Sequence, residues 1–408
     1  MSSSTIHRHR PPIEEATNLA PVSTRERRRR GRRFRQRRIL TGLLATLLVF
    51  AVWLSFSLGG SLMNPALGSS IGARAAEWAR AHGGSGIVNW IENEWYSHHP
   101  PPVGGTPPRG AISQPGVVTT PTSTVPHLAL PAPIIPFAHP AIPGEGQWRP
   151  VGRLVHGIPA VYVTTLRPDA VHTSYVAGVA WMDTKLLRTT LYSGSWIPGG
   201  GPYPNSAPVK PAAATSLVAA FNAGFLMSNA NGGYYTAGHT EIPLRKGGAS
   251  FVVDRNGSAT VGAWGSDVSM NSQVVSVRQN LSLLVAGGHL VAGLNANDTT
   301  KWGYTLGNAV YVWRSGVGVT ASGALVYVGG PGLNITDLAH LLLRAGAVRA
   351  MEMDINTDWV NYSYYTPTTV AGRAGAHNGR ELLPGMSGTP GRYFAPWWAR
   401  DFITVSAR

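Results

Sequence analysis

The sequence contains no cysteine among its 408 residues. This absence excludes disulfide bonds, thiolate metal sites and a cysteine nucleophile. Acidic residues are also scarce, with 19 Asp and Glu against 34 Lys and Arg. Several motifs of common chemistry are missing too: HExxH, GxSxG, a Walker A loop and a dinucleotide-binding glycine fingerprint after a strand. Any catalytic chemistry must therefore rest on other residues.

The positive charge is concentrated at the N-terminus. Residues 1–38 contain twelve arginines and three glutamates, which gives a net charge of +9 out of +15 for the chain. No charged residue occurs from Ile39 to Ala73, and residues 39–58 are almost wholly apolar. Twenty residues at a helical rise of about 1.5 Å span about 30 Å, the hydrocarbon thickness of a bilayer. The sequence therefore predicts one transmembrane helix after a basic tail.

We expect this helix at residues 39–60 and a disordered, Arg-rich tail at residues 1–38. The positive-inside rule places the tail in the cytoplasm and the rest of the chain outside it, so the protein would be a single-pass protein of the cell membrane with a signal-anchor. A cleaved signal peptide is one alternative, although its basic region is normally much shorter. A nucleic-acid-binding tail is another, but the adjoining apolar run explains the charge, and we expect no nucleic-acid partner.

Three segments follow the span. Residues 61–98 are expected to form a juxtamembrane helical segment, with apolar residues at helical spacing from Ala73 onward. Residues 99–145 are rich in proline and predict a disordered, semi-rigid spacer. Residues 146–408 have the composition of a globular domain with many short strands, and we assign them to the α+β class with sheet predominating. The sequence indicates no oligomeric state.

Local patterns in this domain predict particular elements. Asn256-Gly257 separates two apolar runs and is typical of a hairpin turn. A helix is expected after Asn334 or Thr336, either of which can cap it, and Gly346 suits its C-terminal end. Residues 348–354 then predict a strand that leaves this helix.

That strand brings two carboxylates to one face, because Glu352 and Asp354 are two residues apart. Like charges so placed repel unless something compensates. An edge strand with a solvated acidic face is the simpler interpretation, and a catalytic pair is the other. Arg314 lies in an apolar run and needs an anion, which is either one of these carboxylates or a ligand phosphate. A structural salt bridge and a substrate clamp are both consistent with the sequence.

The order of the motifs resembles the phosphodiester glycosidase family, which includes the enzyme that removes N-acetylglucosamine from a phosphodiester to uncover mannose 6-phosphate. The segment AFNAGF, residues 220–225, resembles that family's NAGFF signature, and WRSGVG, residues 313–318, resembles A-R-T-A-[IV]-G. The late helix and strand resemble those that end in L-D-G-G-G-S. The similarity covers roughly residues 215–360, and Asp354 aligns with the family's aspartate. The glycine-rich turn is replaced by Ile355, Asn356 and Thr357.

The resemblance implies hydrolysis or recognition of sugar-1-phosphodiesters in cell-envelope glycopolymers, by a membrane-anchored domain outside the cytoplasm. Asp354 or Glu352 would then be the base or nucleophile, and Arg314 would hold the phosphate. Asn222 would bind a sugar or phosphate oxygen beside the backbone at Gly224 and Phe225. We expect no cofactor and assign no metal ligands. The alternative is a non-catalytic glycan-binding or structural envelope protein, and convergence of Asp354, Arg314 and Asn222 in one open pocket would discriminate the two.

Overall fold

A computed structural model of the chain describes residues 24–64, 67, 70–84, 86–88, 90–91, 101–114, 124–298, 301–303, 310–369 and 372–408. The first 23 residues of the expected tail and residues 92–98 of the expected juxtamembrane segment lie outside them. The chain divides into two units, Met1–Gly60 and Ser61–Arg408, which are described separately. About 20% of the chain is helical and 32% is strand. The predicted β-rich α+β class is therefore confirmed.

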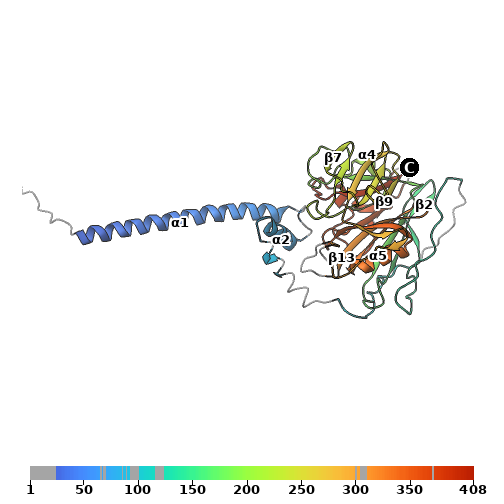
Figure 1. Ribbon diagram of the computed structural model, residues 1–408, viewed down its shortest axis with the longest axis horizontal. Helices are drawn as coiled ribbons and strands as arrows, with labels where there is room; N and C mark the ends of the chain where they lie inside the picture. Colours follow the sequence, from blue (N-terminus) through green and yellow to red (C-terminus); the bar gives the residue numbers. More distant parts are fainter. Residues whose placement is uncertain are drawn as a thin grey trace, which may run out of the picture. The chain divides into compact units, whose positions relative to one another are not determined.

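The N-terminal unit consists of most of helix α1, Thr24–Met63, drawn in blue in Figure 1. The stretch Phe34–Met63 is long and apolar enough to cross a membrane, although a signal sequence would meet the same criterion. The helix begins well before residue 39, so the second half of the Arg-rich segment is helical where we expected disorder. Arginine is a good helix former, and an adjoining apolar helix supplies the nucleus from which helix can propagate.

In the second unit, helix α2, Ile71–Ala81, begins at Ser70, whose side chain accepts a hydrogen bond from the Ala73 N–H. The proline-rich segment differs from the expected free spacer. Leu128 and Ile134 are buried, and the Leu128 N–H donates to Asp183 Oδ2 at 2.7 Å. Proline prevents regular hydrogen-bonded structure but does not prevent apolar side chains from packing. The described residues 124–145 therefore contribute to the core of the domain.

Three antiparallel sheets form the domain. The largest has eight strands, in the order β1 (Arg149–Val155), β2 (Ile158–Leu166), β3 (Ala177–Met182), β14 (Leu325–Leu333), β13 (Val312–Thr320), β15 (Ala347–Ile355), β11 (Leu283–Ala286) and β12 (His289–Leu290). The second has five strands, in the order β7 (His239–Ile242), β6 (Tyr234–Thr236), β10 (Val274–Gln279), β8 (Ala249–Asp254) and β9 (Ala259–Ala263). The third also has five, in the order β17 (Gly379–Glu381), β16 (Tyr362–Tyr365), β5 (Leu217–Asn222), β18 (Phe402–Ala407) and β4 (Leu187–Tyr192).

The expected local elements are present. Strands β8 and β9 pair around Asn256-Gly257, as the turn signal predicted. Helix α5, Ile335–Arg344, is capped by Asn334, whose side chain accepts from the Asp337 N–H. Its leucine stripe is buried against β13, β14 and β15 of the large sheet (Figure 1). Gly346 follows it with a φ of +92°, a conformation that favours glycine. This packing fixes the start of β15, the strand that carries both candidate carboxylates.

Three shorter helical elements complete those that flank the sheets. Helix α4, Pro211–Ala214, has a proline at its first position and leads into β5. The 3-10 helix η3, Ala376–Asn378, precedes β17, and η4, Arg392–Phe394, lies between β17 and β18.

Candidate functional site

Strand β15 lies between β13 and β11, inside the large sheet rather than at its edge. Met351 and Met353 are fully buried in the main core, as alternation along the strand requires. Glu352 is also fully buried, and Asp354 is only 5% exposed. The interpretation of an edge strand with a solvated acidic face is therefore wrong. Two carboxylates have been taken into the interior, and each needs compensation there.

Glu352 is compensated by Arg314. The Arg314 Nη1 lies 2.6 Å from Glu352 Oε1, and both side chains are buried. The remaining guanidinium nitrogens donate to backbone carbonyls, including Leu333 O from Nε at 3.1 Å. Burial raises the pKa of Glu352 to about 7, although Arg314 opposes this shift. Each guanidinium nitrogen of Arg314 already has an acceptor within the protein. The geometry therefore corresponds to a structural salt bridge and not to a substrate clamp.

Asn222, at the end of β5, is equally occupied. Its Oδ1 accepts from the Tyr327 hydroxyl at 2.8 Å and from the Asn361 N–H at 3.0 Å. Its Nδ2 donates to Ser315 Oγ at 2.9 Å. Ser315 in turn donates to the backbone carbonyl of Asp354 at 2.6 Å. Asn222 thus links β5 of the third sheet to β13 of the large sheet. The Ser315 hydroxyl connects it to the backbone of Asp354.

The close approach expected at Gly224 is made by an arginine of the protein. A Cβ on Gly224 would lie only 3.0–3.1 Å from the Arg278 guanidinium, which packs against this backbone. Arg278 donates to the Phe225 carbonyl and pairs with Asp401 at 2.6 Å. The Phe225 side chain is buried with Ile355. Gly224 and Phe225 therefore position a second buried Arg–carboxylate pair.

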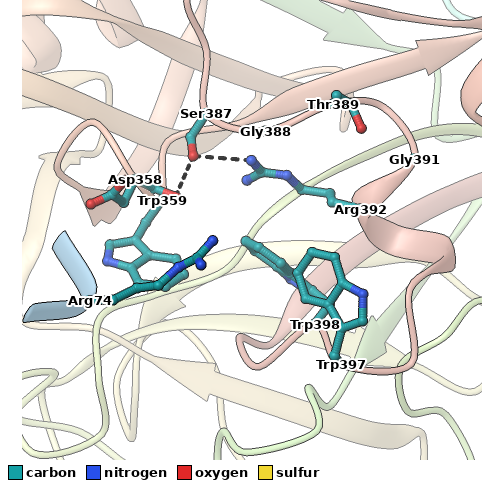
Figure 2. Close-up of a pocket in the computed structure, with 10 residues that line it drawn as sticks. All are labelled: Arg74, Asp358, Trp359, Ser387, Gly388, Thr389, Gly391, Arg392, Trp397 and Trp398. Atoms are coloured by element: carbon teal, nitrogen blue, oxygen red, sulfur yellow. Dashed lines mark hydrogen bonds between the residues drawn. The ribbon is translucent and has the colours of Figure 1, made fainter. Parts of the chain in front are cut away.

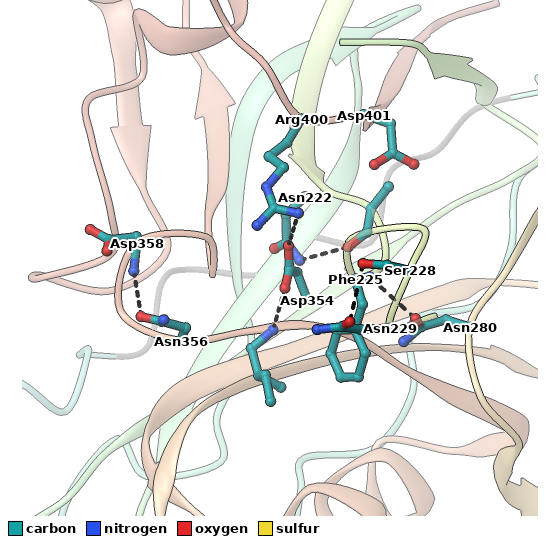
Figure 3. A network of polar contacts seen from close by, with 12 residues as sticks. Asn222, Phe225, Ser228, Asn229, Asn280, Asp354, Asn356, Asp358, Arg400 and Asp401 are labelled. Carbon is teal, nitrogen blue, oxygen red and sulfur yellow. Dashed lines mark hydrogen bonds and ion pairs between the residues drawn. The ribbon is translucent and has the colours of Figure 1, made fainter. Parts of the chain in front are cut away.

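Asp354 has a looser contact with its arginine than Glu352 and Asp401 have with theirs. Its Oδ2 lies 3.9 Å from Arg400 Nη1, and its Oδ1 accepts the Ile355 N–H at 2.9 Å (Figure 3). Burial raises the pKa of Asp354 to about 7, the guanidinium of Arg400 opposes this, and the nearby Asp401 adds to it. Arg400 Nη1 is buried and has no hydrogen-bond partner among the described residues. A carboxyl that titrates near neutrality and a guanidinium with an unused N–H thus face each other.

The turn after Asp354 compensates in part for the missing glycines. Asn356 has a φ of +88°, in the region that glycine favours and asparagine tolerates best among other residues. Its Oδ1 also accepts the Asp358 N–H at 3.2 Å (Figure 3). The Ile355 N–H, by contrast, is used by Asp354 itself. Asn356 thus adopts a conformation that glycine favours, but the Ile355 N–H donates to Asp354 and is not free for a ligand.

A hollow of about 330 Å³ lies beyond Trp359 (Figure 2). We call it the tryptophan hollow, and its lining includes Asp358, Trp359, Ser387, Arg392, Trp397 and Trp398. None of the six residues predicted from the sequence lines it. The Arg400 guanidinium lies over the Trp359 ring, 4.1 Å from its centroid. Trp359 therefore contacts the partner of Asp354 and also forms part of the hollow's wall.

The convergence that we set as a discriminator is thus incomplete. Asp354 and Asn222 are brought together through Ser315, while Arg314 binds Glu352 instead of Asp354. Sequence reasoning did not assign roles to Arg400 or Arg392. For Arg400, the available indication was its place beside Asp401 near the end of the domain. No local sequence feature marks Arg392. Among the described residues, no group of three or more His, Asp or Glu side chains could hold a metal ion.

Comparisons with known proteins agree with the motifs. Residues 215–354 match the model of the phosphodiester glycosidase family. The chain is 14% identical to the catalytic domain of zebrafish N-acetylglucosamine-1-phosphodiester alpha-N-acetylglucosaminidase, auto-inhibited by its pro-peptide, with a TM-score of 0.37 over 61% of this chain and 82% of that one. A hypothetical protein from Synechocystis shares 12% identity, with a TM-score of 0.34 over 64% of both chains.

A putative exported protein from Burkholderia pseudomallei shares 14% identity, with a TM-score of 0.31 over 59% of this chain and 75% of that one. The search of curated proteins found no match. The family match ends at Asp354, so it includes β5, β13 and β15 and leaves out the tryptophan hollow. The resemblance predicted from the motifs is confirmed: residues 215–354 are similar to the phosphodiester glycosidase family.

Proposed function

We propose that this protein is a membrane-anchored, extracytoplasmic hydrolase that acts on sugar-1-phosphodiesters of cell-envelope glycopolymers. One observation carries the proposal. Asp354, which the resemblance aligns with the family's aspartate, lies 3.9 Å from Arg400 Nη1, a donor with no hydrogen-bond partner among the described residues, and burial raises the pKa of this carboxyl to about 7. A general base is most effective when its pKa lies near the working pH. The proposal revises our expectation for the phosphate, because Arg400 replaces Arg314 as the group that meets it.

The chemistry asked of these residues is modest. In a glycosyl phosphodiester the phosphate leaves as a stable anion, so the main requirement is attack at the anomeric carbon. Ionised Asp354 would accept a proton from the attacking water, and Arg400 would stabilise the charge that develops on the leaving phosphate. Glu352 and Arg314 would hold β15 in register through their buried ion pair. The reaction consumes one water and releases a free sugar and a phosphomonoester.

Hydrolysis of a GlcNAc-1-phosphodiester by the full chain in detergent micelles tests this function. Asp354→Asn preserves the size of the side chain and is expected to reduce kcat by about 100-fold or more, because general-base catalysis typically supplies that factor. Asp267→Asn, at an exposed position, is the matched control and should leave the rate unchanged. The full chain is preferable to a fragment starting near residue 145, since Leu128 and Ile134 belong to the core. Equal rates for the wild type and Asp354→Asn would refute the proposal.

Recognition without hydrolysis is the second candidate, and the burial of the site favours it. Asp354 is only 5% exposed, and both Ile355 and Trp359 beside it are buried. A substrate would have to displace one of these side chains to reach the carboxylate. Binding of the same phosphodiester with no turnover in the wild type, under conditions where the protein is folded, would favour this reading.

The cellular location is part of the same proposal. The apolar stretch Phe34–Met63 follows a dense group of arginines, which favours a cytoplasmic N-terminus and an exported domain. A reporter that is active only outside the cytoplasm, fused after Arg408, should be active and should fractionate with membranes. A soluble, exported product would instead indicate a cleaved signal sequence.

A further inference from the structure

We propose that the tryptophan hollow is a binding site for an anionic saccharide, with Arg392 as the anion-binding group and the Trp397 ring as the stacking surface. Its position outside the family-matched segment sets it apart from the site at Asp354. The ligand class rests on the proposed function, because a glycosyl phosphate is the part of a sugar phosphodiester that such a site would hold. The binding itself does not require hydrolysis.

Arg392 is the first reason. It is only 4% exposed, yet its Nε and Nη1 have no hydrogen-bond partner among the described residues. Its Nη2 alone is used, donating to Ser387 Oγ at 3.0 Å (Figure 2). A buried donor without an acceptor costs about 1–3 kcal/mol, and more when it is charged. Each of these unused N–H groups can donate to an oxygen of an anionic ligand, and a hydrogen bond to a charged ligand is stronger than a neutral one.

The local fold is built around this guanidinium. It lies over the Trp398 ring, 4.4 Å from the centroid, and a Cβ on Gly388 would overlap it. Gly388 has a φ of +69°, so glycine is favoured there for both steric and conformational reasons. Burial lowers the pKa of Arg392, but a guanidinium starts so high that it stays charged at neutral pH. A fixed, buried positive charge is thus held at the wall of the hollow.

The remaining lining suits a sugar ring. Trp397 is 44% exposed, and the buried Trp398 Nε1 has no hydrogen-bond partner in the part of the chain that the structure describes, which offers another donor to an oxygen of a ligand. Flat aromatic faces with a polar edge are well suited to ligands that have one apolar and one hydrogen-bonding side. A volume of about 330 Å³ lies at the lower end for small-ligand sites, which run from about 300 to 1,000 Å³. It matches one monosaccharide unit with its charged group.

The charges of the lining allow an anion to enter. The lining contains the guanidiniums of Arg74 and Arg392 and the carboxylate of Asp358, which leaves a net positive charge. Glu381, the other acidic group near Arg392, has its pKa raised to about 7 by burial, so it is partly neutral at that pH. The hollow is therefore suited to an anionic sugar rather than to a cation.

The test measures binding to the full chain in detergent micelles, by calorimetry and by tryptophan fluorescence. The probes are GlcNAc-1-phosphate, neutral GlcNAc, glucuronic acid and inorganic phosphate. We expect GlcNAc-1-phosphate to bind at least tenfold more tightly than either GlcNAc or phosphate, because the site engages both the ring and the anion. Comparable binding of glucuronic acid would identify a carboxylate sugar as an equal ligand of the same site.

Three variants identify the site. Trp397→Ala changes an exposed side chain and should weaken binding of GlcNAc-1-phosphate at least tenfold, with the thermal melting curve unchanged. Arg392→Lys keeps the charge but loses the separate Nε and Nη1 donors of the guanidinium, and it should also weaken binding of GlcNAc-1-phosphate. Trp90→Ala, another exposed tryptophan that does not line the hollow, is the control and should bind normally.

The outcomes separate this inference from the proposed hydrolysis. Loss of binding in Trp397→Ala in a protein without turnover supports the hollow and removes the hydrolase. Binding that is lost in Asp354→Asn but kept in Trp397→Ala overturns the hollow and places the ligand at Asp354. No binding of any probe by the folded wild type overturns it as well.

Discussion

The guanidinium of Arg400 lies 3.9 Å from the carboxylate of Asp354, and it is held there by stacking on Trp359. Because Trp359 also lines the tryptophan hollow, one side chain connects the candidate acid–base group to the candidate sugar site. Glu352 and Arg314 do not belong to this connection, because they form an ion pair with each other inside the sheet. If the proposed hydrolysis takes place, its chemistry would therefore depend on the Asp354–Arg400 pair.

The pH dependence of any hydrolysis should report on this pair. Since burial raises the pKa of Asp354 to about 7 and a base must be ionised, the rate should rise through that pH and level off above it. Arg400→Gln removes the positive charge that lowers this pKa, so the rising limb should move to higher pH. The measurement is kcat/KM from pH 5 to 9 for both proteins. A limb that stays in place would show that the titrating group is not Asp354.

Asp354 should also affect stability in a pH-dependent way. Its folded pKa of about 7 lies above the unfolded value of about 4, so the folded state binds the proton more tightly. Its contribution to the free energy of unfolding is then largest below about pH 4 and is lost as the pH rises to about 7. Asp354→Asn removes the buried charge and should be more stable than the wild type at pH 8, by on the order of 2 kcal/mol.

Urea unfolding of wild type and Asp354→Asn at pH 4.5, 6 and 8 measures this difference. The gain from the substitution should increase with pH and should vanish toward pH 4. Asp267→Asn, with its exposed side chain, should show no such trend. A gain that is constant across this range would mean that the carboxylate is not desolvated in the folded protein.

Separating the buried ion pair should be costly. Arg314→Ala leaves Glu352 without its partner in the sheet interior, and breaking such a pair costs about 3–5 kcal/mol. Combining Arg314→Met with Glu352→Leu, which replaces both charges by apolar groups, should recover much of that loss. Arg380→Ala at an exposed position gives the baseline for losing an arginine.

Unfolding free energies of the single, double and control variants test this role. A substrate-clamp role for Arg314 predicts a different pattern: normal stability of Arg314→Ala, with a raised KM. That result would return Arg314 to the position we expected from the sequence.

The turn after Asp354 offers a sharper comparison. Asn356 has a φ of +88°, so Asn356→Gly should be tolerated within about 1 kcal/mol, because glycine adopts this region freely. Asn356→Ala loses the same side-chain hydrogen bond as Asn356→Gly but keeps a Cβ, which is disfavoured at positive φ. It should therefore be about 1–2 kcal/mol less stable than the glycine variant. Thermal melting of the two variants measures the difference. Equal stability would mean that the turn adopts another conformation.

Short-range patterns were enough to predict much of the fold. Asn256-Gly257 specified its hairpin, and Asn334 with Gly346 bounded helix α5, because turns and caps depend on local backbone conformation and on single side chains. The apolar run also predicted a helix long enough to cross a membrane, although the helix extends further back than the charge pattern suggested. The packing of residues 124–145 could not be predicted, because a proline-rich composition does not show whether its apolar side chains find a core.

The site depended more strongly on tertiary structure. The sequence alone identified Asp354, Glu352 and Arg314 as unusual, because charged groups in apolar strands must be compensated, whereas Asn222 was identified through the family resemblance. Which group compensates which was decided by sheet order: placing β15 beside β13 pairs Glu352 with Arg314. The return of β18 beside β5 brings the end of the chain, with Arg400, to Asp354. The sequence determined which residues need partners, and the tertiary structure chose the partners, because residues far apart in the chain meet only through non-local strand pairing.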